Sequence, residues 1–209
     1  MIKQLRPYLL FLCLSSLSGF AMAGKEVSHP GATGHAKLDA FVNSSFNLYK
    51  KNASLFEEID GIGALSAMIM ADPQGFASTT ASGSLDDAIS TAKDSSSRKV
   101  QNWDKTLQNK SVSDALDGVS DDSKAALLSR VQQLGTRITS NQTEAQTKNV
   151  GAEAGTLLGK AKSLLGDMPK NPFKAKDYIK ALNASKSVLK KMSVEYPEKL
   201  GVLSQFLAQ

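Results

Sequence analysis

The longest regular alternation of apolar and polar positions lies between residues 38 and 59. Apolar residues recur there every three or four positions: Leu38, Phe41, Val42, Phe46, Tyr49, Ala53, Leu55, Phe56 and Ile59. Because an α-helix has about 3.6 residues per turn, this spacing gives a helix with one broad apolar face. The pattern predicts a long helix that ends near Asp60 and Gly61.

Residues 62–71 (IGALSAMIMA) carry no charge and are followed by Asp72 and Pro73. We interpret them as a short helix buried in the core. The alternative is a membrane-active segment that stays hidden until activation. A helix needs about 20 apolar residues to span a bilayer, which this stretch does not reach. Residues 74–83 (QGFASTTASG) have the composition of a loop.

A second long helix is predicted to begin at Ser84, because Ser84 and Asp87 have the spacing of an N-terminal capping box. Its apolar face comprises Leu85, Ala88, Ile89, Ala92, Val100, Trp103 and Leu107. One short helical turn is then expected over residues 112–116, which ends at Gly118. These elements would share the core with the first helix.

Ser120, Asp121 and Asp122 start another predicted helix, since acidic residues favour the positive end of the helix dipole. Its buried side would comprise Leu127, Val131, Leu134 and Ile138. Residues 139–149 (TSNQTEAQTKN) contain almost no apolar side chain. They are either a loop or the solvated middle of one helix that continues to Leu165, with a length of about 70 Å.

Asn171 and Pro172 suit the N-cap and first position of a further helix. Its apolar residues are Phe173, Tyr178, Ile179, Leu182, Val188, Leu189 and Met192. Pro197 is expected to break it, and Leu200, Val202, Leu203, Phe206 and Leu207 predict a last short helix. Since no strand-like alternation or repeat is visible, we predict an all-α bundle of four or five principal helices, with one long helix as a variant.

The first 23 residues have the order of a cleavable signal peptide: a positive start with Lys3 and Arg6, an apolar run, and Ala21 and Ala23 at a small-x-small site. We therefore divide the chain into a signal peptide (1–23), a flexible N-terminal arm (24–36) and a single helical domain (37–209). The only cysteine, Cys13, belongs to the signal. The mature chain is thus cysteine-free, and disulfides and thiolate chemistry are excluded from it.

The composition indicates a bacterial exported protein, located in the periplasm or the medium. An extracellular domain of this size without disulfides is more typical of bacteria than of animals. Five N-x-S/T sequons begin at Asn43, Asn52, Asn109, Asn141 and Asn183. We interpret them as products of a composition rich in Ser, Thr and Asn rather than as glycosylation sites.

Charge is divided unevenly between the two halves of the mature sequence. Residues 24–122 have 9 Lys and Arg against 14 Asp and Glu, a net −5, whereas residues 123–209 have 14 against 6, a net +8. Seven lysines are concentrated in one stretch: Lys170, Lys174, Lys176, Lys180, Lys186, Lys190 and Lys191. They are candidates for contact with an acidic partner or an anionic surface, against the simpler interpretation of a solvated face.

Gly151, Gly155 and Gly159 follow each other at four-residue spacing. On a helix they share one face, and glycines in that pattern let another helix approach closely. Because each glycine costs about 1 kcal/mol of helix propensity relative to alanine, a packing purpose is plausible. A loop around Gly151, or packing within a soluble bundle, would explain them equally.

No catalytic, cofactor-binding or metal-ligating residue can be assigned from the sequence. His29 and His35 are the only histidines, and neither has acidic or histidine neighbours at ligand spacing. Three carboxylate pairs, Glu57-Glu58, Asp86-Asp87 and Asp121-Asp122, stand at predicted helix ends, where acidic residues commonly cap. If these carboxylates were catalytic instead, the protein would be a carboxylate-based hydrolase, which is the third function class considered.

The sequence favours a non-enzymatic, exported helical bundle that binds another macromolecule, most readily another protein. Secretion accessory, periplasmic chaperone, inhibitor and adhesion factor are roles of this kind. The alternative is a membrane-active or pore-forming protein, and an anionic membrane surface is a second candidate partner. Nucleic acid is not expected, because arginine and interleaved aromatic residues are scarce in the basic half. No cofactor is predicted, and the oligomeric state is unknown.

The mature protein is expected to begin at Gly24 and to be found outside the cytoplasm, because the charged, apolar and small-residue segments occur in the required order. Mass spectrometry of the native protein would check this. Acyl modification of Cys13, or retention of residues 1–23, would contradict the prediction.

Overall fold

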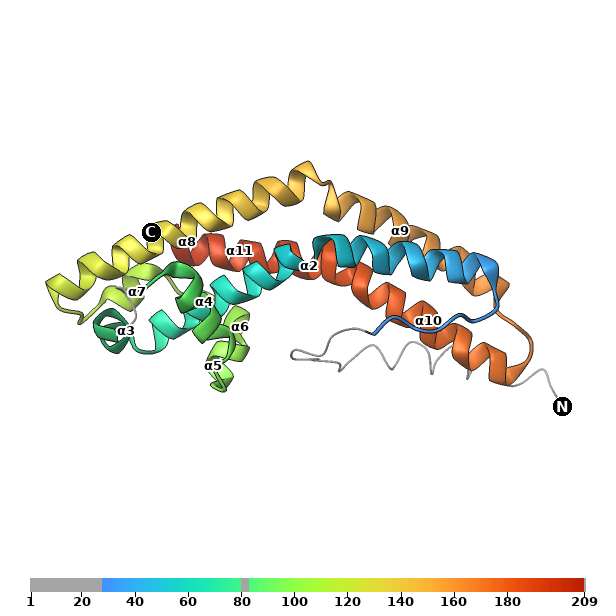
Figure 1. Ribbon diagram of the computed structural model, residues 1–209, viewed down its shortest axis with the longest axis horizontal. Helices are drawn as coiled ribbons and strands as arrows, with labels where there is room; N and C mark the ends of the chain where they lie inside the picture. The colour runs from blue at the N-terminus through green and yellow to red at the C-terminus, as the bar shows by residue number, and fades with distance from the viewer. Residues whose placement is uncertain (1–27, 80–82, 209) are drawn as a thin grey trace.

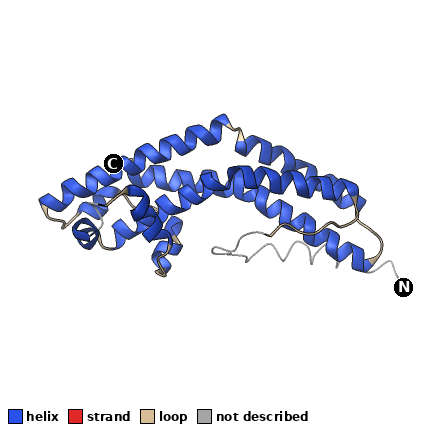
Figure 2. Cartoon of the chain, viewed as in Figure 1, coloured by secondary structure: helices blue, strands red, loops and turns tan. Residues whose placement is uncertain are grey.

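The computed structural model describes residues 28–79 and 83–208 of the chain. The expected signal peptide and its cleavage site lie outside the described residues. Throughout the described ranges the regular structure is helical and no strand occurs (Figure 2). The prediction of an all-α fold is therefore confirmed.

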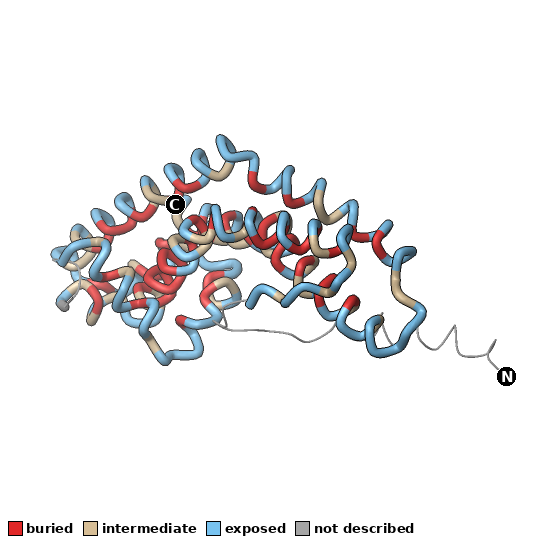
Figure 3. The backbone as a smooth tube through the Cα atoms, turned by 45° about the vertical axis from the view of Figure 1, so that its right-hand side comes forward, coloured by how far each residue is buried: buried red, intermediate tan, exposed pale blue. Residues whose placement is uncertain are grey.

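Three long rods run along the molecule (Figure 1). The first is α2 (Ala36–Ala71), the second is formed by α8 (Asp121–Thr147) and α9 (Val150–Leu164), and the third by α10 (Pro172–Lys190), the π-helical η2 (Lys191–Glu195) and α11 (Tyr196–Leu207). Short helices, α3 (Pro73–Thr79), α4 (Leu85–Lys93), α5 (Arg98–Gln101), α6 (Trp103–Leu107) and α7 (Val112–Leu116), surround the C-terminal half of α2. Buried positions follow the helix sides that face one another (Figure 3).

The first helix does not end near Asp60 and Gly61, as the sequence suggested, but continues to Ala71. Both Gly61 and Gly63 lie inside it, where the absence of a side chain lets other helices approach its backbone. A Cβ atom at Gly63 would overlap the indole ring of Trp103, and one at Gly61 would press on Ile89. These glycines therefore serve helix packing rather than helix termination.

Two further expectations in the same region are wrong. Residues 74–79 are not a loop, because the Asp72 carboxylate accepts the Gly75 N–H at 2.9 Å and Pro73 is preset for a first turn, so that α3 forms there. The helix that begins after Ser84 is not long. Its N-cap is confirmed, with the Ser84 hydroxyl accepting the Asp87 N–H, but it ends at Lys93.

The run Asp-Ser-Ser-Ser at residues 94–97 separates α4 from α5. Serine and aspartate side chains compete for backbone hydrogen bonds and so disfavour continued helix. Here the Ser95 hydroxyl accepts the Ser97 N–H at 3.3 Å. The chain then turns, and Trp103 is carried onto the glycine face of α2, where it is 4% exposed.

The sequence left open whether residues 139–149 form a loop or a helix. Residues 139–147 are helical and complete α8. The second rod is interrupted at Asn149, whose φ of 52° is left-handed, before α9 begins at Val150. Asparagine tolerates this conformation better than most residues and commonly ends helices in it. A single helix of about 70 Å is therefore not formed.

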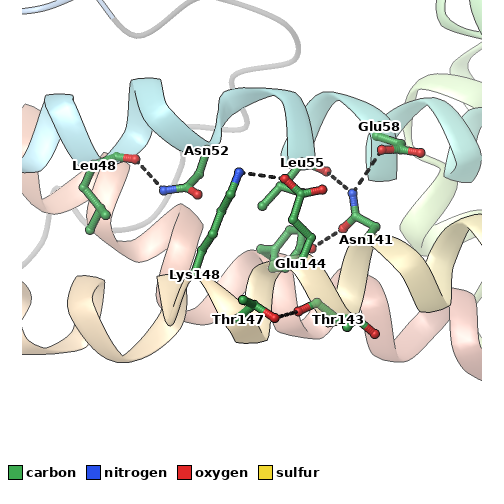
Figure 4. Close-up of polar contacts among 10 residues, drawn as sticks. Leu48, Asn52, Leu55, Glu58, Asn141, Thr143, Glu144, Thr147 and Lys148 are labelled. Atoms are coloured by element: carbon green, nitrogen blue, oxygen red, sulfur yellow. Dashed lines mark hydrogen bonds and ion pairs between the residues drawn. The ribbon is translucent and has the colours of Figure 1, made fainter.

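Asn141 holds the polar part of α8 against the other two rods (Figure 4). Its side chain is 2% exposed, and its amide donates to the Leu55 carbonyl oxygen at 3.1 Å and to the Glu58 carboxylate at 3.4 Å. The Tyr196 hydroxyl donates to the Asn141 side-chain oxygen. One buried amide thus joins α2, α8 and α11.

Burial of Tyr196, together with the nearby carboxylates of Glu58 and Glu144, raises the pKa of its phenol to about 12. The hydroxyl therefore remains a neutral donor at physiological pH.

Pro197 does not break the third rod, contrary to expectation. Proline lacks the N–H that an α-helix would use, and the preceding turn widens into η2, in which the Tyr196 N–H bonds to the Lys191 carbonyl oxygen. The helix continues into α11 with Pro197 in its first turn. Asn171, by contrast, caps α10 as predicted, accepting the N–H groups of Phe173 and Lys174 at 3.0 and 3.4 Å.

The described part of the N-terminal arm, residues 28–35, contacts the bundle. The His29 ring lies 4.8 Å from the Phe46 ring, centre to centre, and its Nε2 is 3.0 Å from the Asn43 amide oxygen. The Asp39 carboxylate accepts the N–H and hydroxyl of Thr33, both at 2.8 Å, and these bonds lower its pKa. Residues 24–27 of the expected flexible arm lie outside the described residues.

Replacing Gly63 by Ala should lower the free energy of unfolding by about 1–3 kcal/mol, because the added methyl group would displace the Trp103 ring. Gly155→Ala is the matched control: Gly155 is also helical, but an added Cβ would meet nothing within 4 Å. It should gain up to about 1 kcal/mol from helix propensity. Urea unfolding followed by circular dichroism measures both. A gain of similar size at both positions would mean that Trp103 does not pack on α2.

Tyr196→Phe should cost about 1–3 kcal/mol, because it leaves the buried Asn141 oxygen without its donor. The pH dependence gives a second test. The phenol has a pKa of about 12 in the fold, against about 10 in an unfolded chain. Between these values the unfolded state releases the proton first, so stability falls as pH rises.

The variant lacks this group, so the stability difference between wild-type and Tyr196→Phe protein should shrink from about pH 10 upward. Urea unfolding at several alkaline pH values would measure it. All other titratable groups are common to the two proteins, so their contributions cancel in the comparison. A difference that stays constant to about pH 12 would contradict the raised pKa of the buried Tyr196 phenol.

Candidate interaction surface

Charge separates between the two ends of the molecule. We call residues 28–55 and 149–191 the basic lobe; it contains the N-terminal half of α2 with α9 and α10. It carries 12 lysines against 4 acidic residues, a net +8. The acidic lobe, residues 56–79, 83–148 and 192–208, has 10 Lys and Arg against 15 Asp and Glu, a net −5. The uneven division seen along the sequence is therefore a division in space.

The lysines predicted to form a contact surface are all on the outside of the basic lobe. At about 100° per residue, five of them fall within an arc of about 140° on the third rod, opposite its buried side. These five are Lys176, Lys180, Lys186, Lys190 and Lys191. Lys186 and Lys191 are partly exposed and the other predicted lysines are exposed. Lys170 and Lys174 stand at the start of α10.

None of these seven lysines forms an ion pair within residues 28–79 and 83–208. Two of the four acidic residues of the basic lobe have other partners: Asp39 binds Thr33, and Asp167 pairs with Lys37 at 3.1 Å. α10 thus carries five lysines against one acidic residue, Asp177, and its net charge is strongly positive. A surface of this kind attracts anionic partners over a distance of several ångströms, with strong dependence on salt.

Two cations of the acidic lobe join its helices. Arg137 bridges Glu58 of α2, at 3.3 Å, and Asp86 of α4. Lys199 of α11 contacts Asp60 and lies 5.3 Å from the centre of the Trp103 ring. Glu58 and Asp86, from two of the carboxylate pairs considered for hydrolysis, therefore meet around one guanidinium group that joins helices.

The predicted close packing at Gly151, Gly155 and Gly159 does not occur within the described chain. All three are exposed on α9, and an added Cβ at each would meet nothing within 4 Å. The same four-residue row continues backward along α8 through Thr147, Thr143, Thr139 and Gly135. Thr139, Thr143 and Thr147 each donate to a carbonyl four residues earlier in their own helix.

Residues 62–71 lie mostly in the core, as the favoured interpretation required. Ile62 and Leu65 are fully buried and Ile69 is 1% exposed, whereas Met68 and Met70 are only partly covered. In the described ranges, no helix is long and apolar enough to cross a membrane. The segment therefore contributes to the core of the acidic lobe in this conformation.

The two histidines are not brought together. His29 lies against Phe46, whereas the His35 ring makes an edge contact with the Tyr178 ring at 5.3 Å. The described residues contain no group of three or more His, Cys, Asp or Glu side chains that could hold a metal ion.

An open groove between α2 and α9 is lined by Ser44, Asn47, Lys51, Glu153 and Thr156, among others.

Sequence reasoning missed the exposure of two apolar residues beside the predicted lysines. Phe173 was assigned to the buried face of its helix but is 82% exposed, and Leu165 is 54% exposed. Phe173 falls at the edge of the lysine side of α10, about 120° from the centre of the buried side, and an angular plot of the sequence could have revealed this. Two sequons, at Asn52 and Asn141, are inaccessible because these side chains are 3% and 2% exposed.

No family model matches this chain, and neither does any curated protein or solved structure.

Proposed function

We propose that this chain is an exported, non-enzymatic helical bundle that binds an anionic macromolecule through its basic lobe. The observation that supports this most strongly is the set of seven exposed or partly exposed lysines on α10 and its flanks, which have no ion-pair partner within the described residues. A secretion accessory, a periplasmic chaperone, an inhibitor and an adhesion factor would all use such a surface. The N-terminal pattern supports export.

The distribution of side-chain contacts favours binding over catalysis. The acidic lobe devotes Arg137, Glu58 and Asp86 to contacts between helices, which is a structural use of charge. The basic lobe instead leaves the seven lysines on and around α10 without an ion-pair partner among the described residues. An acidic surface on the partner would be drawn to this lobe and would be repelled by the other, so the orientation of the complex follows from the charges.

Reversing the charge of Lys180 and Lys190 to Glu tests the proposal. Both are exposed, and both lie on the outer side of α10. The mature protein, immobilised and presented with envelope extract at low salt, should retain an acidic partner that elutes as salt approaches about 0.5 M. The double variant should lose most of this retained material while its circular dichroism spectrum stays unchanged.

Lys99→Glu with Lys105→Glu is the matched control, because both lysines are exposed in the acidic lobe. This variant undergoes the same change of net charge and should retain the partner. Equal loss in both double variants would indicate non-specific dependence on net charge. Undiminished retention after reversal of Lys180 and Lys190 would overturn the assignment of the basic lobe.

A further inference from the structure

The far end of the basic lobe combines exposed apolar residues with lysines. It is formed by the turn between α9 and α10, residues 165–176, which we call the tip. Among the described residues, the large apolar side chains that are exposed are Leu128, Leu165 and Phe173, and two of these three belong to the tip. Residues 160–177 also carry five lysines against two aspartates, a net +3.

The tip is held in shape by buried and capping contacts. Tyr178, which is 1% exposed, donates its hydroxyl to the Leu164 carbonyl oxygen at 2.6 Å and so ties the end of α9 to α10. Asn171 accepts the N–H of Phe173 at 3.0 Å, which fixes the first turn of α10. Phe173 is therefore presented outward on a fixed backbone and does not depend on a flexible loop.

Charge at the tip is left largely positive. Asp167, within the turn, pairs with Lys37 of α2 at 3.1 Å. Lys162, Lys170, Lys174 and Lys176 are exposed around the two apolar residues. An exposed aromatic ring with exposed lysines close to it in the sequence suits the boundary of an anionic bilayer, where the ring enters the headgroup region and the ammonium groups meet phosphates.

We propose that the tip docks the protein end-on to an anionic phospholipid membrane, with Phe173 and Leu165 entering the interface. This inference rests on the proposed function, because it names the partner of the basic lobe. A protein partner is the less favoured occupant: a stable protein interface buries about 800 Å² on each side with matching shape, whereas the apolar area here is two side chains on a protruding turn. A membrane needs no complementary pocket.

The experiment measures binding of the mature protein to vesicles that contain phosphatidylglycerol and phosphatidylcholine. Phe173→Trp provides a reporter, because the native Trp103 is in the acidic lobe, is 4% exposed and gives a constant background. Fluorescence of the introduced indole should shift to shorter wavelength on binding and be quenched by lipids brominated near the headgroup. Vesicles of phosphatidylcholine alone should produce little change.

Two matched pairs of variants separate the contributions. Phe173→Ser should weaken partitioning about tenfold or more, since it removes a side chain whose burial is worth that factor. Leu128→Ser, at the exposed apolar residue of the acidic lobe, should leave partitioning unchanged. Lys174→Glu with Lys176→Glu should reduce binding at low salt by at least tenfold, whereas Lys99→Glu with Lys105→Glu should not.

The outcomes distinguish this inference from the proposed function. If lysine reversal abolishes vesicle binding but Phe173→Ser has no effect, the contact is electrostatic only and the tip does not insert, although the basic lobe still binds anions. If a protein is retained in a Phe173-dependent manner and vesicles are not bound, the tip docks on protein and the membrane inference is overturned. If reversing the lysines of the basic lobe changes neither vesicle binding nor partner binding, both proposals are wrong.

Discussion

The buried side chain of Asn141 is the contact on which the arrangement of the three rods depends. The C-terminal part of α8, residues 139–147, has almost no apolar residues, so the hydrophobic effect alone would not hold it against α2. A single amide compensates by bonding to the Leu55 carbonyl, to Glu58 and to the Tyr196 hydroxyl. Such a network stabilises the fold only while every member is satisfied, because a buried polar group without a partner is costly. The same region contains the break at Asn149 and the π-helical turn before Tyr196. The two lobes therefore meet where two rods change direction. At this point the hydrogen-bonded Asn141 amide holds the rods in a fixed position relative to one another.

Features governed by local chemistry could be predicted from the sequence. The N-caps at Ser84 and Asn171 and the buried side of α8 depend on neighbouring residues, and they occur where expected. Features governed by tertiary contacts could not be predicted from the sequence. Gly61 reads as a helix end in isolation, and only the approach of Ile89 and Trp103 explains why α2 continues past it. Pro197 likewise reads as a break, but widening of the preceding turn lets the helix proceed.

The candidate surface was predictable in charge but not in shape. Seven lysines could be identified by counting, since their clustering is a property of the sequence. Their separation in space from the acidic residues could not be predicted from the sequence. It depends on the fold, because α2 contributes one half to each lobe and the third rod passes from one lobe to the other. The exposed position of Phe173, by contrast, could have been inferred from its angular position on the helix, which is close to that of the lysines. Phe173 was assigned to the buried face because it is apolar, but it is 82% exposed.

Opposite charges at the two ends give the molecule a large electric dipole along its length. In the field of a charged surface such a body experiences a torque before it makes contact, so it would arrive already turned, with α10 leading and the short helices trailing. The search over orientations, which slows most encounters between macromolecules, is then shortened. The acidic end would be carried outward into solvent, where its short helices α3–α7 would be displayed to whatever approaches from that side.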